Sequence, residues 1–263
     1  MSNILPAPRF ATPDYEYIAK LAGTPAGEDG PIFMVNLMKY RAVADYGDGR
    51  ASGRTGREAD DLYAPREILH DIGAEIVFAA DVEQQLLGDP HWDRVAIVRY
   101  PTRAAFLAMP LRRDFQEKRV HKEAGMEQTI VMACVPEIVP TLPPPAPVEL
   151  AAGDQPFVML HVLRFAEGGE AKMAQYGASA GAAGLALGVR PQAYFAVEGT
   201  VLGDGRQWDQ VRFNSFPSHE IYRELRANST HKAAQPDRAA ALTDTFTLML
   251  LPRINRLGAA ANG

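Results

Sequence analysis

Apolar residues along the chain gather in short runs typical of β-strands, and these runs alternate with stretches of helical periodicity. Residues 32–40 are apolar at every second position on both faces, except at Asn36, and this pattern predicts a buried strand. Residues 88–91 (Gly-Asp-Pro-His) are a cluster of turn formers, so they predict a hairpin between two flanking strands. The further strands of the first half are predicted at residues 75–87, 94–100 and 129–135.

Two helices are predicted between these strands. The first covers residues 63–71, with Pro65 tolerated in its first turn and Gly73 ending it, and the second covers residues 102 to about 122. A helix before the first strand is also expected, with Thr12 as its N-cap and Pro13 as its first residue. The resulting order β-α-β-β-α-β is typical of ferredoxin-like domains.

The second half of the chain repeats the first. Pro31 to Tyr40 matches Pro156 to Phe165, and the later blocks follow in the same order with loops of slightly different length. These later matches pair Trp92-Asp93 with Trp208-Asp209, His121-Lys122 with His231-Lys232, and Pro136 with Pro252. A repeat longer than ~100 residues indicates tandem domains rather than a solenoid.

A proline-rich stretch, residues 136–147, separates the two copies. Such a density of proline favours a stiff, extended linker over a helix or a central strand. We therefore expect a boundary near residue 140, with one ferredoxin-like unit in residues 1–140 and a second in residues 141–263.

Strands that are apolar on both faces need cover on both faces. The helices cover one face of each four-stranded sheet, and the sister sheet is available to cover the other. We therefore predict an α+β fold in which two ferredoxin-like βαββαβ units pack sheet to sheet as an intrachain α/β barrel. The insert at residues 41–61 is either a lid or a solvated excursion.

Composition narrows the possible partners. The chain has 27 basic and 32 acidic residues, a net charge of −5, which does not favour nucleic acid or anionic membranes. Its single cysteine, Cys134, rules out a disulfide within the chain. No apolar run approaches the ~20 residues of a membrane span, and the first ten residues lack the features of a signal peptide, so we expect a cytoplasmic protein.

Several blocks of the first half resemble a known family. They are Gly30 to Leu37, Val82-Glu83, Trp92 to Val95, Arg99 to Pro101, and Phe106 to Met109. They are similar to the domain-of-unknown-function family 1330, closely over residues 12–136 and more loosely over residues 157–252. This resemblance implies membership of the dimeric α/β-barrel superfamily, together with antibiotic-biosynthesis monooxygenases, muconolactone isomerases and haem-binding chlorite dismutases. The superfamily hosts many chemistries, so the resemblance implies a fold rather than a reaction.

Asn36 and His161 occupy equivalent positions in apolar strands. One interpretation is a buried polar group that is satisfied by a neighbouring strand or by water. The other is that both line a pocket in the barrel lumen, where His161 can act as a general base.

Tyrosine and histidine recur at the helix ends of both halves. Tyr63 and Tyr176 open the first helix of each unit, as packing residues or as part of a site. His121 and His231 end the second helix, where a cation favours the helix dipole and where a barrel mouth can gather polar groups.

Glu83 is an acid within the predicted strand 75–87. It is either a lumenal proton carrier or the ion-pair partner of Arg94 or Arg99. With the residues above, it completes the candidate set: Asn36, Tyr63, His121 and His161 as catalytic groups, and Glu83, Arg99, Tyr176 and His231 as substrate-binding groups.

Common catalytic motifs are absent from the sequence. It contains no GxGxxG or Walker loop, no GxSxG elbow, and no HExxH or paired histidines at metal-ligand spacing. We therefore expect a small-molecule enzyme of the barrel lumen, an isomerase, lyase, cyclase or cofactor-free oxygenase, without organic cofactor or metal. The alternatives are a binding protein for an apolar metabolite and a haem protein with His161 or His231 as ligand.

One pocket is expected to use residues from both halves. We place Asn36, Tyr63 and His121 in it, with His161 contributing from the second half. Because the chain carries its own sister sheet, we expect a monomer or a modest homodimer.

Overall fold

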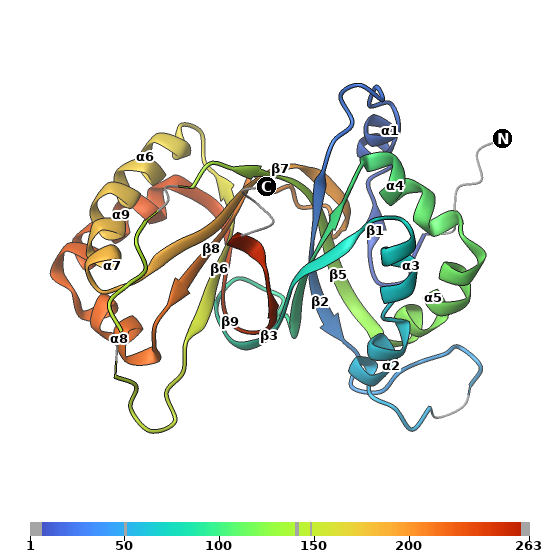
Figure 1. Ribbon diagram of the computed structural model, residues 1–263, viewed down its shortest axis with the longest axis horizontal. Helices are drawn as coiled ribbons and strands as arrows, with labels where there is room; N and C mark the ends of the chain where they lie inside the picture. Colours follow the sequence, from blue (N-terminus) through green and yellow to red (C-terminus); the bar gives the residue numbers. More distant parts are fainter. Residues whose placement is uncertain (1–6, 50–51, 140–141, 148, 259–263) are drawn as a thin grey trace.

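The computed structural model describes residues 7–49, 52–139, 142–147 and 149–258, and its centre is a closed antiparallel barrel (Figure 1). The hydrogen-bonded order around the barrel is β2-β4-β3-β9-β6-β8-β7-β5, and β5 returns to β2. The predicted α+β fold, with two ferredoxin-like units forming one barrel within the chain, is confirmed.

The strands of the two halves occur in the same order. The first half contributes β2 (Ile32–Tyr40), β3 (Glu75–Leu87), β4 (Arg94–Tyr100) and β5 (Met126–Glu137). The second half contributes β6 (Phe157–Phe165), β7 (Arg190–Gly203), β8 (Gln210–Phe216) and β9 (Leu242–Asn255). A short strand, β1 (Thr12–Pro13), pairs with the end of β7.

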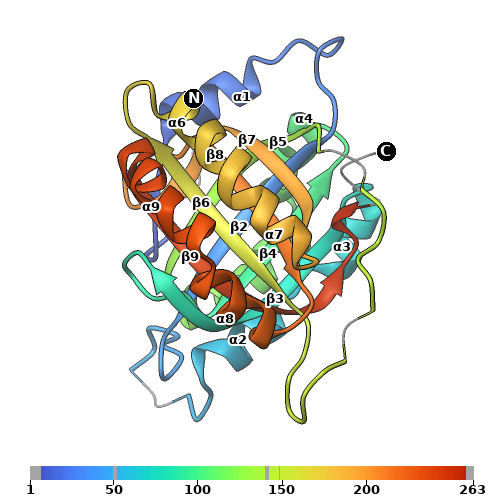
Figure 2. The ribbon, with the colours of Figure 1, turned by 90° about the vertical axis from the view of Figure 1, so that its left-hand side faces the viewer.

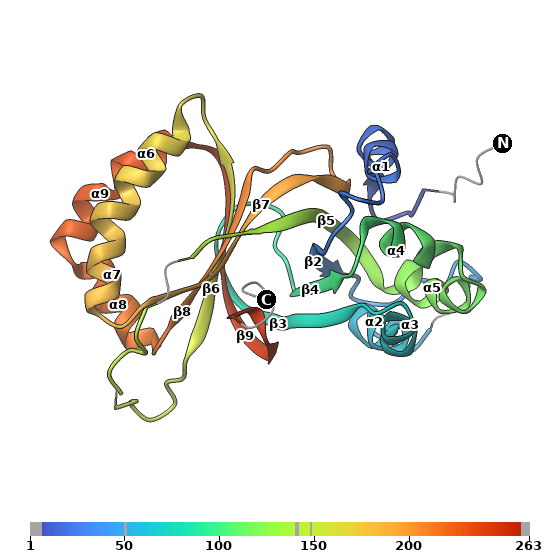
Figure 3. The same cartoon turned by 45° about the horizontal axis from the view of Figure 1, so that its top comes forward.

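The helices form two layers on opposite sides of the barrel (Figure 3). The first layer consists of α1 (Tyr15–Ala22), α2 (Gly56–Tyr63), α3 (Arg66–Asp71), α4 (Arg103–Ala108), the 3₁₀ turn η1 (Met109–Leu111) and α5 (Arg113–Gly125). The second consists of α6 (Gly169–Tyr176), the π-helical turn η2 (Gly177–Gly181), α7 (Ala182–Ala186), α8 (His219–Ala227) and α9 (Ser229–Ala241). Figure 2 shows this second layer lying across β6 and β9. Within the described residues, no helix is both long and apolar enough to span a bilayer.

Three helix predictions need correction, in two of them because proline interrupts the backbone. The helix predicted at residues 63–71 is two helices, since Pro65 precedes α3 and α2 begins earlier, inside the insert. The long second helix is broken at η1, which contains Pro110. The first helix is capped by Asp14, whose side chain accepts from Tyr17 N, and not by Thr12, which lies in β1.

The sheets of the two halves pack face to face, and their edge strands are also hydrogen-bonded to each other. Strand β5 of the first half pairs with β7, and β3 pairs with β9, so no sheet edge of the barrel is left open. The domain boundary expected near residue 140 lies outside the described residues, and the division at that point stays a prediction.

The barrel interior is packed with apolar side chains from both halves, each at most 3% exposed. Phe33, Val35 and Leu37 of β2 belong to this interior cluster, together with Val158, Leu160 and Val162 of β6. The phenyl ring of Phe246 lies 5.6 Å from the ring of Trp92 and 5.0 Å from that of Trp208. The barrel interior is therefore a hydrophobic core, and burial of its apolar surface stabilises the fold.

The halves match each other in detail. Asp93 accepts a hydrogen bond from Tyr40 N, and Asp209 accepts the equivalent bond from Phe165 N. Helices α5 and α9 are each 13 residues long and each runs directly into the last strand of its half.

Aligned end to end, α5 and α9 match Lys122 with Arg238 and Phe115 with His231. The sequence match of His121-Lys122 with His231-Lys232 is therefore not a structural equivalence. His231 has no histidine counterpart in the first half.

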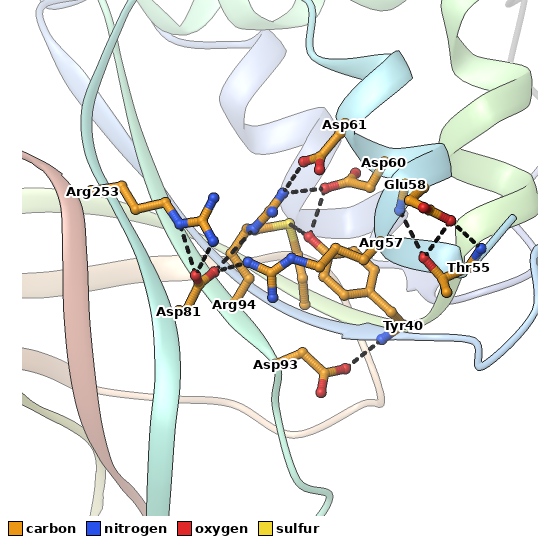
Figure 4. A network of polar contacts seen from close by, with 11 residues as sticks. Tyr40, Thr55, Arg57, Glu58, Asp60, Asp61, Asp81, Asp93, Arg94 and Arg253 are labelled. Atoms are coloured by element: carbon orange, nitrogen blue, oxygen red, sulfur yellow. Dashed lines mark hydrogen bonds and ion pairs between the residues drawn. The ribbon is translucent and has the colours of Figure 1, made fainter.

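The end of the insert docks on the sheet through a charged network (Figure 4). Tyr40 Oη donates to Asp60 Oδ2 of α2 at 2.6 Å, and Arg94 of β4 contacts the same carboxylate at 3.3 Å. Asp81 of β3 binds Arg57 of α2 and, at 2.7 Å, Arg253 of β9. Residues 56–61 thus belong to the helix layer rather than to a free lid.

Candidate functional site

Asn36 and His161 do not point into the barrel lumen. The interior face of β2 carries Phe33, Val35 and Leu37, so Asn36 lies on the outer face, where its Nδ2 donates to Met34 O at 2.8 Å. His161 likewise lies on the outer face of β6, opposite in direction to Leu160 and Val162.

The strands β2 and β6 are separated by three strands on either side of the eight-stranded barrel. The outer faces of these two strands lie under different helix layers. The expected single pocket containing both Asn36 and His161 is therefore wrong.

A row of polar residues crosses the outer face of the second half. In the strand register, His161 lies opposite Thr247 of β9 and opposite Arg212 of β8. Arg212 lies opposite Tyr194 of β7, which in turn lies opposite Glu137 of β5. Five consecutive strands thus place a polar side chain on one line beneath the second helix layer.

Further polar groups face this row from the helices. Arg238 of α9 reaches the sheet, and its Nη2 donates to Thr247 Oγ1 at 3.2 Å. Tyr176, the last residue of α6, has its ring 6.4 Å from the ring of His231 on α9. The structure thus brings together three predicted site residues, His161, Tyr176 and His231.

Arg212 is held in place by its neighbours. Its Nε donates to Gln210 Oε1 at 2.5 Å, and its guanidinium lies 5.0 Å from the centre of the Tyr194 ring. Gln210 in turn donates to Glu137, and Tyr194 Oη donates to Asn214 Oδ1 at 3.0 Å. Within the described chain, the two terminal nitrogens of Arg212 have no hydrogen-bond partner.

The site holds two arginines and one acid of the row, Glu137, which acts on Arg212 at a distance and accepts from Gln210. Neither Arg212 nor Arg238 forms an ion pair with any described residue. Burial lowers the pKa of both guanidinium groups. The fields of Tyr194 and Glu137 oppose this effect at Arg212, and the field of Arg212 adds to it at Arg238. Both arginines are half-buried, and a half-buried guanidinium that makes no ion pair keeps hydrogen-bond donors available.

His161 is uncharged in this environment. Burial, followed by the positive fields of Arg238 and Arg212, lowers the pKa of His161 to about 3. Its Nδ1 lies 3.3 Å from Thr247 Oγ1, and its Nε2 makes no hydrogen bond with the described residues. A neutral imidazole with one free nitrogen can accept a proton from a ligand.

Small residues dominate the helices above the row. Helix α6 continues into the π-helical turn η2, whose sequence is Gly-Ala-Ser-Ala-Gly, and helix α9 presents Ala234 and Ala241 as buried residues. π-Helical turns occur frequently at functional sites.

The first half has an equivalent group of residues with different chemistry. Tyr63, at the end of α2, packs edge to face on Phe115 at 5.8 Å, and Lys122 Nζ lies 5.0 Å from the centre of the Tyr63 ring. His121 is turned away from the sheet and its Nδ1 lies 2.8 Å from Tyr46 Oη of the insert. The expected grouping of His121 with Asn36 is not seen.

Glu83 forms an ion pair, but not with either expected arginine. Its Oε2 lies 2.7 Å from His219 Nε2 of α8, across the junction of the halves, because the end of β3 runs beside the second unit. The equivalent pair, Glu198 of β7 with Arg103 of α4, joins the halves on the other side. Arg99 is partly exposed at the end of β4 and joins neither group.

Sequence reasoning missed Arg212, Arg238, Tyr194 and Lys122. A signal for Arg212 exists, because Val211-Arg-Phe-Asn alternates apolar and polar residues where the first half has Val95-Ala-Ile-Val. Arg238 stands in an alanine-rich helix, and its inward direction depends on the helix phase. In the described residues, no group of three or more histidine, cysteine or acidic residues is placed to hold a metal ion.

No family model and no curated protein matches the chain. Among solved structures, RPA0582, a protein of unknown function from Rhodopseudomonas palustris, is 29% identical over 51% of this chain and 98% of that chain, with a TM-score of 0.40. An anthrone oxidase-like protein is 13% identical over 89% and 98% of the two chains, with a TM-score of 0.50. A mutant chlorite dismutase from Candidatus Nitrospira defluvii is 11% identical over 89% and 94%, also with a TM-score of 0.50.

The chain therefore has the ferredoxin-like α/β-barrel fold of these last two proteins. At such low identity the likeness concerns the fold, and the chemistry has to be argued from the side chains. Membership of family 1330 stays a prediction.

Proposed function

We propose that the protein is a small-molecule enzyme whose site lies between the outer face of β6–β8 and the helices of the second half. Its ligand is a small organic anion, a carboxylate, enolate or phenolate, held by Arg212 and Arg238. The reaction is a proton transfer in which His161 accepts a proton from the bound ligand. This replaces the lumenal site that the sequence suggested.

The observation that supports this proposal most strongly is the pair of guanidinium groups that form no direct ion pair with any residue the structure describes. A planar guanidinium with free terminal nitrogens binds two oxygens of a carboxylate or an enolate in parallel. Positive groups also stabilise the negative charge that develops on oxygen when an adjacent carbon loses a proton. The same pair disfavours a purely apolar ligand.

His161 has the position that a base requires. It lies in register between Arg212 and Thr247, so a ligand bound to the arginines is next to its free Nε2. The anion also offsets the positive field that depresses the pKa of His161, so the imidazole becomes a better base when the ligand is bound. Tyr176 and Tyr194 lie at the border of the same region and bring hydroxyl groups to it.

Haem binding is the second candidate, and a specific residue supports it. His231 on α9 is 8% exposed, and its Nδ1 is buried without a partner in the described part of the chain. An imidazole nitrogen of this kind can serve as an axial iron ligand, and haem, when bound, would supply iron redox chemistry. A Soret band that appears on titration with haem and is lost in His231→Ala would support this candidate.

Deuterium exchange separates an enzyme from a binding protein. We expect wild-type protein to bind phenylpyruvate and to accelerate exchange of its benzylic protons in D₂O, followed by NMR. His161→Gln should keep the binding and lose the acceleration. Binding without any acceleration by the wild type would contradict the enzymatic part, and absence of binding would contradict the site itself.

A further inference from the structure

The first half carries its own group of residues at the position that corresponds to the proposed site. Strand residue Asn36 matches His161, and Lys122 matches Arg238 when α5 and α9 are aligned end to end. Tyr63 ends the first-layer helix as Tyr176 ends α6. Each half thus combines a tyrosine, a polar strand residue and a helix-borne cation.

The cation of the first half is enclosed by aromatic rings. Lys122 Nζ lies 5.0 Å from the centre of the Tyr63 ring and 5.9 Å from that of Phe10. Tyr63 packs with the cluster that contains Met34, and Phe10 packs with Met38. Because Asn36 lies between these two methionines on β2, the ammonium group lies over that stretch of the strand.

No acid neutralises Lys122 among the described residues. Two carboxylates act on Lys122 through their fields, but Asp60 is engaged by Tyr40 and Arg94, and Glu123 by Arg119. Burial lowers the pKa of Lys122, the fields of Asp60 and Glu123 oppose this effect, and the field of Arg119 adds to it. A larger share of this amine is therefore neutral, and so nucleophilic, than is usual for lysine.

Other polar atoms of this region are also available. Neither Tyr63 Oη nor Asn36 Oδ1 has a hydrogen-bond partner within the part of the chain that the structure describes. A tyrosine hydroxyl can pass protons to and from a carbonyl oxygen, and the rings of Phe10 and Tyr63 favour an apolar substituent.

We propose that Lys122 is the reactive amine of a second site, one that takes small apolar aldehydes or ketones and binds them covalently as an imine. The neutral Nζ attacks the carbonyl carbon, a C–N bond forms, and the C=O π electrons move to oxygen, which takes up a proton. The carbinolamine then loses its oxygen as water with a proton from nitrogen. No oxidant or reductant is consumed, and water restores the amine.

This site differs in chemistry from the one in the second half. Arginine stays protonated in proteins and does not form imines, so the matching Arg238 can bind anions only. The proposal does not rest on the proposed function, because no residue of the second half takes part in it.

Reductive trapping tests the proposal. The intact protein is treated with benzaldehyde and sodium cyanoborohydride, which delivers a hydride to the imine and leaves a stable secondary amine. Peptide mapping then compares the six lysines of the chain: Lys20, Lys39, Lys118, Lys122, Lys172 and Lys232. We expect Lys122 to carry several-fold more adduct than the exposed Lys232.

Matched variants show whether the adduct depends on Lys122 itself. Lys122→Arg retains the positive charge and should lose the main adduct, whereas Lys232→Arg should leave it unchanged. Tyr63→Phe retains the ring and should slow the trapping. Adducts distributed over the exposed lysines, with Lys122 unmodified in the folded wild-type protein, would overturn the proposal.

Discussion

Arg212 of β8 lies directly opposite His161 of β6 in the antiparallel register, and both side chains point away from the barrel interior. The strand register keeps these two residues adjacent more firmly than a loop contact would, because a one-residue slip would turn their side chains into the core. A cation and a neutral imidazole are thereby held side by side beneath a helix layer.

The arginines should determine the affinity for organic anions. Replacement of Arg212 or Arg238 by glutamine should weaken binding of phenylpyruvate about ten- to hundredfold, from ~1.5–3 kcal/mol per charge-assisted hydrogen bond. Isothermal titration calorimetry measures this, and Arg113→Gln, at an exposed position of the first half, is the control. Equal losses in the control would argue against a localised site.

Anion binding should be coupled to proton uptake. The folded pKa of His161 is about 3, below its usual value, so the free site holds no proton there at neutral pH. An anion offsets the two arginine charges and raises that pKa, so affinity should increase as the pH falls through the raised pKa of the bound state. Calorimetry in buffers of different ionisation enthalpy reports the protons directly. Uptake that persists in His161→Gln would show that another group is responsible.

The pH dependence of stability should involve His219. Burial alone would lower the pKa of His219, but its contacts with Glu83 and Asp154 outweigh burial and raise it. Protonated His219 therefore stabilises the junction of the halves at low pH, and this contribution is lost as the pH rises through the raised pKa.

The first half supplies the control for that prediction, because Arg103 occupies the matching position with Glu198 as its partner. His219→Arg should remove this loss of stability on the alkaline side of the ordinary histidine pKa, because arginine stays protonated there. Thermal unfolding of both proteins across this range is the measurement. Identical pH profiles would contradict a role for the Glu83–His219 pair.

Loss of the barrel core should reduce stability without removing the site. Phe246→Ala removes a fully buried ring between Trp92 and Trp208, and should cost about 3–5 kcal/mol of unfolding free energy. Urea unfolding measures this, with the exposed Leu62→Ala expected to change stability by less than ~0.5 kcal/mol. A folded Phe246→Ala protein that no longer binds anions would favour a lumenal site instead.

Much of the fold can be predicted from the sequence, but the face of the sheet on which the candidate site lies cannot. The strands were predictable because their apolar positions recur with period two, as in residues 32–40, and strands apolar on both faces required a second sheet. The same double-sided pattern hides which face is inner. Of the two interpretations of Asn36 and His161, the lumenal one is therefore wrong, whereas Asn36 does bond the neighbouring strand through Ala96 O.

The helix-borne groups were harder to predict. The inward direction of Arg238 and Lys122 depends on where α9 and α5 begin, and helix boundaries are set by tertiary contacts as well as by local sequence. The His-Lys pairs at residues 121 and 231 have the same sequence but lie in different turns of their helices. Only the alignment of whole helices shows that His231 corresponds to Phe115.

The location of the bound anion tests the account most directly. Crystals of the wild-type protein with 4-bromobenzoate allow the bromine to be located by its anomalous scattering. We predict one site on the outer face of β6 and β8, with the carboxylate between Arg212 and Arg238 and next to His161. A bromine inside the barrel, or under the first helix layer with the second left empty, would contradict it.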